Sequence, residues 1–167
     1  MILTRCMLRR VTGAMITAVA LLASLLASAA QDKLAPATDL RADAKRVTSG
    51  VPLIVLVSLP GCPHCEVVRR SHLLPLLNDR TAAPKPLIRQ VEMNGQEILR
   101  DFGGQAITHG EFVSRFKVRI APVVMFFDAN GEMIAGPLVG SMIPDFYGAY
   151  FDAALAEARS RLPATRP

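Results

Sequence analysis

The chain alternates between continuous hydrophobic runs and amphipathic segments, and this pattern predicts strands separated by helices. Two continuous apolar runs, 51–58 and 123–127, are rich in β-branched or aromatic residues and predict strands, and the first is typical of a strand that is buried on both faces of a sheet. Residues 86–93 are predicted to form another strand. Helical periodicity or helix-start signals occur in the segments around them: 38–48, 62–70, 109–117 and 144–162. Strands and helices in this order predict an α/β domain whose sheet lies between helices.

The segments between these elements predict further local structure. Asp128–Gly131 is a turn signal, and residues 132–135 are expected to return as a hairpin that adds an antiparallel edge and makes the sheet mixed. Residues 94–107 are polar and contain glycine, so we expect an irregular insertion there. Thr108 and Glu111 have the spacing of a capping box, which predicts that a helix starts beside them.

Two of the predicted helices carry specific expectations. Pro75 is expected to interrupt or restart its helix, because a proline inside a helix removes one hydrogen bond and clashes with the preceding turn. The last helix is expected to bury one apolar face. The residues predicted to lie on that face are Phe146, Tyr150, Phe151, Ala154, Leu155, Ala158 and Leu162.

Residues 1–30 have the composition of a targeting segment. Three arginines precede an uncharged stretch, Val11–Ala30, which ends in the small residues that a signal peptidase accepts. This predicts a cleaved signal peptide that exports the following domain from the cytosol. The alternative is an uncleaved membrane anchor, because 20 uncharged residues are just enough to span a bilayer.

The rest of the sequence is long enough for one domain with a hydrophobic core. We predict a linker at 31–37, the domain at 38–162 and a tail at 163–167. Without the leader the formal charge falls from +5 to +2, because the leader carries three arginines and no acidic residue. No basic block stands out in the remainder, so a nucleic-acid partner is not expected.

Two of the three cysteines occur in the stretch LPGCPHCE, residues 59–66. Haem attachment requires a histidine directly after the second cysteine, and Glu66 stands there. A zinc site normally needs four ligands; no second cysteine pair follows, and His72 and His109 are isolated and expected at the surface. A structural disulfide across two residues would constrain the unfolded chain little. The spacing therefore favours a redox pair that needs no metal and no other cofactor, with zinc and a structural disulfide as alternatives.

A redox pair gives each residue of the motif a role. At a helix N-terminus, unpaired amides and the helix dipole favour the thiolate of Cys62, the expected nucleophile. Pro63 falls at the first helical position, where its missing N–H costs nothing. Cys65, nearly one turn further on, is expected to resolve the mixed disulfide. His64 is expected to lower the Cys62 pKa through a hydrogen bond or a charge, or else to be a solvated helix residue.

Together with a second segment, this motif resembles the thioredoxin superfamily. The second segment, 119–132, places Ala121 and Pro122 directly before an apolar strand. The resemblance covers roughly residues 40–160 and implies a thioredoxin-like fold, with a central mixed sheet flanked by helices. It also implies a cis Ala121–Pro122 peptide facing the disulfide, with the Ala121 backbone open to pairing with a substrate.

The resemblance implies an activity and a location as well. The chain is most similar to exported bacterial thioredoxin-like proteins, including those of sulfur-oxidation clusters, and Cys-Pro-His-Cys is also the tetrapeptide of periplasmic dithiol oxidases. A periplasmic thiol–disulfide oxidoreductase is therefore expected, with protein thiol or disulfide substrates and a membrane or periplasmic redox partner. Whether it reduces or oxidises remains open. An anchored form would face the periplasm from the inner membrane.

Two positions depart from the pattern of cytosolic thioredoxins. Gly61 stands where those proteins have a tryptophan, and Leu56 stands where they have a buried acid that accepts the proton of the resolving thiol. Two other function classes remain as alternatives. One is a carrier of a soft ion such as Cu(I), with the two thiolates and Met125, Met133 or Met142 as ligands. The other is a non-catalytic thioredoxin-fold binding protein.

Overall fold

The computed structural model describes residues 32–48, 50–79, 81, 85–140 and 144–163. The chain divides into two units, Met1–Ala30 and Gln31–Pro167. The predicted leader lies outside the described residues, as does most of the predicted tail. Within the described ranges, no helix is both long and apolar enough to cross a membrane.

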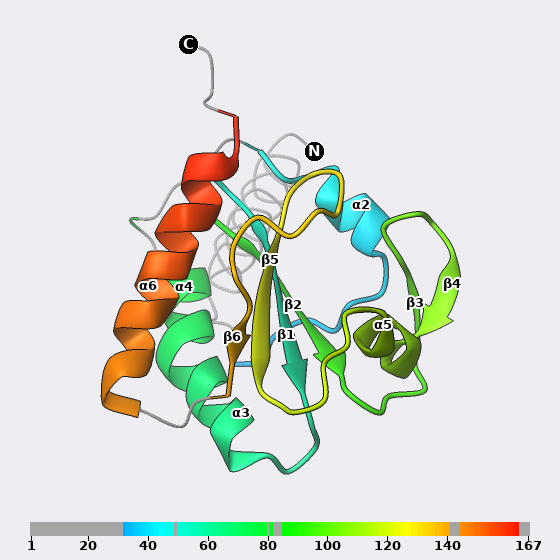
Figure 1. Cartoon of the computed structure of the whole chain (residues 1–167), viewed down its shortest axis with the longest axis horizontal. Coiled ribbons are helices and arrows are strands. Elements are labelled where there is room, and N and C mark those ends of the chain that lie inside the picture. Colours follow the sequence, from blue (N-terminus) through cyan, green and yellow to red (C-terminus); the bar gives the residue numbers. More distant parts are fainter. Residues whose placement is uncertain (1–31, 49, 80, 82–84, 141–143, 164–167) are drawn as a thin grey trace, which may run out of the picture. The chain divides into compact units, whose positions relative to one another are not determined.

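A four-stranded mixed sheet forms the centre of the second unit (Figure 1). Its strands, in the order in which they pair, are β2 (Leu87–Glu92), β1 (Leu53–Ser58), β5 (Val123–Phe127) and β6 (Leu138–Val139). Strand β1 is parallel to β2 and antiparallel to β5, and β5 is antiparallel to β6. Every residue of β1 and β5 is buried, as their continuous apolar runs predict.

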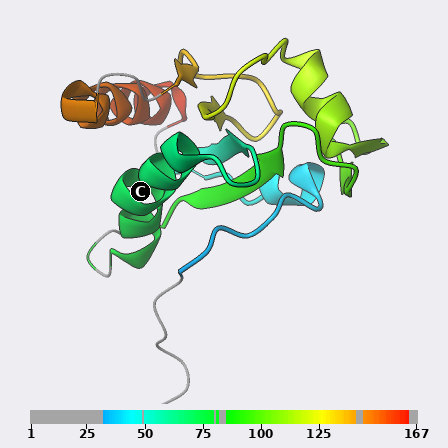
Figure 2. The same cartoon turned by 90° about the horizontal axis from the view of Figure 1, so that it is seen from below.

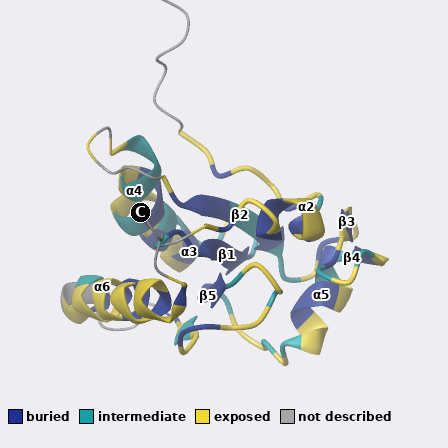
Figure 3. Cartoon of the chain, turned by 90° about the horizontal axis from the view of Figure 1, so that it is seen from above, coloured by how far each residue is buried: buried dark blue, intermediate teal, exposed yellow. Residues whose placement is uncertain are grey.

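Helices cover both faces of this sheet (Figures 1 and 3). On one side lie α6 (Pro144–Arg161) and a helical run made of α3 (Pro63–Val68), the π-helical segment η2 (Arg69–Leu73) and α4 (Leu74–Asn78). On the other side lie α2 (Leu40–Ala44) and α5 (His109–Arg115). Figure 2 shows α6 beside the α3–α4 run from a second direction. The predicted α/β class and the mixed sheet flanked by helices are confirmed.

Two adjacent residues of β5 pack against elements on opposite faces of the sheet. Phe126 packs against Phe151 of α6, with ring centroids 6.1 Å apart. Phe127, the next residue, packs against Phe116 and Phe102, with centroids 5.3 and 4.9 Å apart. Successive side chains of a strand point to opposite faces, so one short strand anchors both helical layers.

The helical run that begins at Pro63 continues past Pro75. Pro75 has no N–H to donate to the carbonyl of Ser71, and the π-helical segment Arg69–Leu73 ends just before it. A π-helical turn has hydrogen bonds between residues five apart, so the helix can continue although Pro75 has no N–H to donate. The chain therefore stays helical to Asn78. The predicted interruption is therefore a change of helical type and not a break.

The predicted irregular insertion at 94–107 contains a short hairpin, so that prediction is wrong in part. Strand β3 (Ile98–Arg100) pairs antiparallel with β4 (Ala106–Thr108). Leu99 and Ile107 face each other in this pairing, and both are buried. These two apolar residues pack the hairpin on the core, and Arg100 N donates to Thr38 O at 2.9 Å.

The capping box at the start of α5 is confirmed. Glu111 N donates to Thr108 Oγ1 at 3.1 Å, and the Glu111 carboxylate accepts from Thr108 N at 2.7 Å. The predicted return at 132–135 forms only in part: Asp128 N donates to Glu132 O at 3.0 Å, and Met133 makes an isolated bridge to Phe127. The regular partner of β5 is β6, which comes later in the chain.

Part of the predicted linker at 31–37 belongs to the fold. Leu34 and Ala37 are buried, Ala37 N donates to Gln90 O at 2.8 Å, and Gln90 N donates to Ala35 O at 2.9 Å. These bonds occupy backbone groups on the outer edge of β2, which would otherwise lack partners. Residues 34–37 are therefore an extra edge of the sheet.

His109, predicted at the surface, is buried, with 2% of its area exposed. Its Nδ1 accepts from Glu92 N at 3.2 Å, so Nε2 carries the proton and donates to Ala37 O at 2.9 Å. One imidazole thus connects α5, the end of β2 and the N-terminal edge. The prediction is wrong because no local pattern shows this pairing between distant segments.

The buried face of α6 is rotated from the predicted one. Phe146 and Tyr150 are 60% and 59% exposed, and Tyr147, which the prediction left out, is buried. A helix turns by about 100° per residue, so a stripe that begins at Tyr147 points its predecessor toward solvent. The remaining predicted residues are buried: Phe151, Ala154, Leu155, Ala158 and Leu162.

His72, also predicted at the surface, is half-buried beneath α6. Its ring packs against Tyr147 and Phe151, with ring centroids 5.0 and 5.8 Å apart. Burial lowers the pKa of His72, and the nearby Asp152 carboxylate opposes this shift. The folded protein therefore favours the neutral imidazole.

Replacing His72 by phenylalanine is expected to reduce the loss of stability in mild acid. Because the pKa of His72 is lower in the folded protein than its ordinary value of about 6.5, the unfolded chain binds the proton more readily. The contribution of His72 to stability is complete above that value and is lost as the pH falls through the lowered folded pKa. Urea midpoints at about pH 7.5 and about pH 5.5 check this, and equal losses in both proteins would contradict it.

Candidate active site

The loop between β1 and α3 places the CxxC motif at the C-terminal end of the central strand β1. Strand β1 ends at Ser58, and Gly61 has a φ of 67°, a left-handed conformation that favours glycine. Cys62 is the N-cap of α3, with an extended backbone, and Pro63 follows at the start of the helix. The helix therefore begins directly after the first cysteine.

Cys62 and Cys65 form a disulfide, with their Cα atoms 5.3 Å apart. The two residues differ in their surroundings: Cys62 is half-buried, whereas Cys65 has 0% of its area exposed. The Cys65 N–H donates to Cys62 Sγ at 3.1 Å. An amide donor at the start of a helix favours a negatively charged sulfur. Cys62 is thus the more accessible residue of the pair and its sulfur has an amide donor, whereas Cys65 is shielded.

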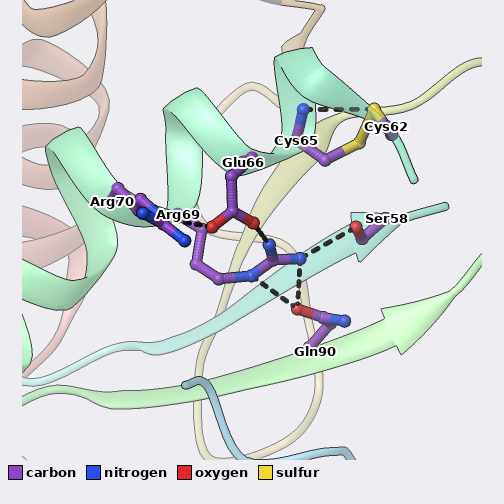
Figure 4. A network of polar contacts seen from close by, with 7 residues as sticks. All are labelled: Ser58, Cys62, Cys65, Glu66, Arg69, Arg70 and Gln90. Carbon is purple, nitrogen blue, oxygen red and sulfur yellow. Dashed lines mark hydrogen bonds and ion pairs between the residues drawn. A yellow bond between two sulfur atoms is a disulfide. The ribbon is translucent and has the colours of Figure 1, made fainter. Parts of the chain in front are cut away.

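A polar network lies beside the disulfide (Figure 4). Arg69 donates to Gln90 Oε1 from Nε at 3.1 Å and from Nη2 at 2.9 Å, and Nη2 also donates to Ser58 Oγ at 3.2 Å. The Glu66 carboxylate pairs with both Arg69 and Arg70. Through these contacts Arg69 connects the helix that carries the CxxC motif to strands β1 and β2.

A groove of about 350 Å³ opens on the β2 side of the disulfide. It is lined by Cys62, by Pro63 and by the loop 59–61. Four polar side chains complete the lining: Glu66, Arg69, Gln90 and Glu92. Burial and the neighbouring Arg70 charge lower the pKa of Arg69, which still leaves the guanidinium protonated, since arginine is not deprotonated in proteins.

On the other side of the motif, β5 begins with a cis peptide bond between Ala121 and Pro122. Val123 pairs with Val57 near the C-terminal end of β1, so Pro122 and the CxxC motif lie at the same end of these two paired strands. Pro122 is buried, Ala121 is partly exposed, and the Pro122 carbonyl accepts from Gly140 N at 2.8 Å.

The structure places the other residues considered in the sequence as follows. His64 is exposed on the first turn of α3. The Glu66 carboxylate is directed to the two arginines and away from the sulfurs, as Figure 4 shows. Leu56 is fully buried in β1, where it pairs with Gln90 and Val124, so no carboxylate stands at that position.

Sequence reasoning missed Arg69 and Gln90. The three-residue spacing of Glu66 and Arg69 is a signal for an ion pair on a helix. The contact between Arg69 and Gln90 has no such signal, because the two residues are 21 positions apart and meet only through the parallel pairing of β1 and β2.

The structure also bears on the proposed metal ligands. Over the part of the chain that the structure describes, no group of three or more His, Cys, Asp or Glu is placed to hold a metal ion. Met125 is buried in β5, Met133 is 41% exposed after the turn, and Met142 lies outside the described residues.

Comparisons with known proteins find similarity among solved structures. No family model matches the chain, and no curated protein matches it. Mitochondrial thioredoxin 3 from Saccharomyces cerevisiae, in its oxidised form, is 14% identical with a TM-score of 0.46, over 71% of this chain and 94% of that one. Thioredoxin f from spinach chloroplast is 11% identical with a TM-score of 0.48, over 76% and 97%. A thioredoxin-fold protein from Helicobacter pylori is 14% identical with a TM-score of 0.44, over 68% and 83%.

Three features of this chain together form the thioredoxin-like arrangement that the sequence resemblance predicts. They are the mixed sheet between two helical layers, the CxxC disulfide at the start of the helix after β1, and the cis peptide before β5.

Proposed function

We propose that this chain is a thiol–disulfide oxidoreductase of the thioredoxin superfamily, acting through Cys62 and Cys65. The observation that carries the proposal is the asymmetry of the disulfide. Cys62 is accessible and accepts an N–H at a helix start, whereas Cys65 is fully buried. Another disulfide can reach the first sulfur but not the second, and this separates a nucleophile from a resolving thiol.

Thiol–disulfide exchange proceeds through two successive displacements at sulfur. In the reducing direction, the Cys62 thiolate attacks one sulfur of a substrate disulfide, that S–S bond breaks, and the other substrate sulfur leaves as a thiolate. Cys65 then gives its proton to the substrate thiolate released in the first step and attacks Cys62 Sγ, and the mixed disulfide breaks to release the second substrate thiolate. Two electrons pass from the cysteine pair to the substrate. Oxidation of a dithiol runs the same steps in reverse.

The residues around the disulfide have supporting roles in this proposal. The backbone of Ala121, partly exposed before the cis Pro122, pairs with an extended substrate segment next to the disulfide. Pro63 fixes the start of the helix behind Cys62. His64, exposed on the first turn, tunes the Cys62 thiolate.

We further propose that the protein acts in the periplasm on protein thiols and disulfides, as an exported thioredoxin-like protein of the sulfur-oxidation-cluster type. The support is the basic start, uncharged stretch and small-residue ending of residues 1–30, together with the Cys-Pro-His-Cys tetrapeptide. A membrane or periplasmic redox partner then returns the pair to its working state, because each turnover leaves it oxidised or reduced.

Equilibration with glutathione buffers tests the proposed function. The purified protein is expected to show one two-electron transition of the Cys62–Cys65 pair between about −270 and −120 mV, the range of known thiol–disulfide catalysts, and to accelerate exchange in a protein disulfide. Alkylation followed by mass measurement reports the state of the pair. A midpoint below about −300 mV without acceleration would identify a structural disulfide. Tight stoichiometric binding of Cu(I) without exchange activity would identify a metal carrier.

A further inference from the structure

Arg69 is held where the elements of the proposed active site meet. Its side chain is 16% exposed, whereas that of the adjacent Arg70 is 75% exposed. Arg69 contacts the end of β1 through Ser58, β2 through Gln90 and α3 through Glu66. A guanidinium fixed by this many partners is a permanent charge in a fixed place.

Arg69 and Cys62 line the same groove. The charged residues that line it are Glu66 from α3, Arg69 from η2 and Glu92 from β2, so Arg69 is the one cation among the lining residues that the structure describes. Glu66 is shared between Arg69 and Arg70 and does not neutralise Arg69 alone.

Residue 56 of β1 adds no negative charge that would oppose Arg69. Leu56 is fully buried there, and its pairing partner on β2 is Gln90, the neutral residue that holds Arg69. Charges in a partly buried site are screened less by water than charges on the surface, so a nearby cation acts more strongly on a thiolate.

We infer that Arg69 is a positioning residue for the Cys62 thiolate, which holds the motif helix on β1 and β2 and supplies the positive charge that favours the reduced pair. The inference rests on the proposed function. Reduction by two glutathione molecules converts the disulfide to a dithiol and yields one glutathione disulfide. A cation that stabilises the thiolate favours this reaction and makes the Cys62–Cys65 disulfide a stronger oxidant.

The adjacent arginine provides a matched control. We expect Arg69→Gln to lower the equilibrium constant for reduction by glutathione about tenfold, which is about 30 mV, and to raise the pKa of Cys62 by about one unit. Arg70→Gln removes the same formal charge from an exposed side chain that does not line the groove, so its effect is expected to stay within about twofold. Arg69→Lys keeps the charge and is expected to restore much of the equilibrium constant.

Glu66→Gln tests the direction of the electrostatic effect on Cys62 while Arg69 stays in place. The loss of the counter-charge is expected to raise the equilibrium constant and lower the Cys62 pKa. The pKa is followed by thiolate absorbance and by the pH dependence of alkylation in the reduced protein.

Three outcomes overturn the inference: an effect of Arg69→Gln within about twofold, equal effects of Arg69→Gln and Arg70→Gln, or a shift by Glu66→Gln in the same direction as Arg69→Gln. The proposed function fails separately, through a wild-type midpoint outside the catalytic range. The Cys62 pKa still reports on Arg69 in that case, because its measurement needs no turnover.

Discussion

Replacing Cys62 by serine is expected to abolish disulfide exchange, whereas replacing Cys65 by serine is expected to leave the first displacement intact and trap the substrate. Without Cys62 the remaining thiol is fully buried and cannot reach a substrate disulfide, so the rate is expected to fall by several orders of magnitude to the uncatalysed level. Without Cys65 the mixed disulfide on Cys62 has no resolving thiol, and it accumulates.

The two variants are compared in the reduction of a protein disulfide and by mass measurement under non-reducing conditions. The Cys65→Ser protein should carry one substrate molecule per chain, released by added thiol. Cys6→Ser is the matched control, because Cys6 stands in the predicted leader, and it should keep wild-type activity. Trapping by Cys62→Ser in place of Cys65→Ser would reverse the roles, and full activity in both would exclude the mechanism.

Replacing Asp43 by alanine is expected to lower the free energy of unfolding by about 3–5 kcal/mol. The Asp43 side chain is 9% exposed and binds Arg89, itself 18% exposed, through two hydrogen bonds of 2.6 and 2.5 Å. This pair joins α2 to β2, and its second contact, Arg46 at 3.5 Å, lies at the surface. Removal of the carboxylate leaves the Arg89 charge largely buried without its partner, which costs more than the pair itself contributes.

A double variant and a surface control distinguish that cause from a general loss of charge. Asp43→Leu combined with Arg89→Met is expected to recover most of the stability, because two apolar side chains leave no unpaired charge. Glu157→Gln on α6 breaks an ion pair whose side chains are 43% and 57% exposed, and should cost less than about 1 kcal/mol. Urea unfolding measures all three, and a cost below about 1 kcal/mol for Asp43→Ala would contradict the prediction.

The elements that sequence could predict are those whose signals are local. The segments 51–58, 86–93 and 123–127 contain β1, β2 and β5. Strands β1 and β5 are buried throughout and therefore need apolar residues on both faces, whereas only three of the six residues of β2 are buried. The spacing of Thr108 and Glu111 marked the start of α5 for an equally local reason, since both partners lie within one turn.

Sequence reasoning failed where a residue's partner lies far along the chain. His109 is isolated in the sequence and expected at the surface, yet its partners are the backbones of residues 37 and 92, which only the fold brings together. At the candidate site, the CxxC motif indicated the disulfide, and the resemblance indicated the Ala121–Pro122 peptide. No sequence pattern identified Arg69, because its contact with Gln90 depends on strand register.

The N-terminal edge formed by residues 34–37 determines where the folding unit can be cut. A chain trimmed to begin at Thr38, the predicted start of the domain, would lose the backbone partners on the outer edge of β2 and the Ala37 carbonyl that accepts the hydrogen bond from His109 Nε2. Strand β2, which would lose these partners, carries Gln90. Gln90 in turn binds Arg69, which lines the groove next to Cys62. Any shortened version meant to retain the native redox properties therefore has to keep the chain from Leu34 onward.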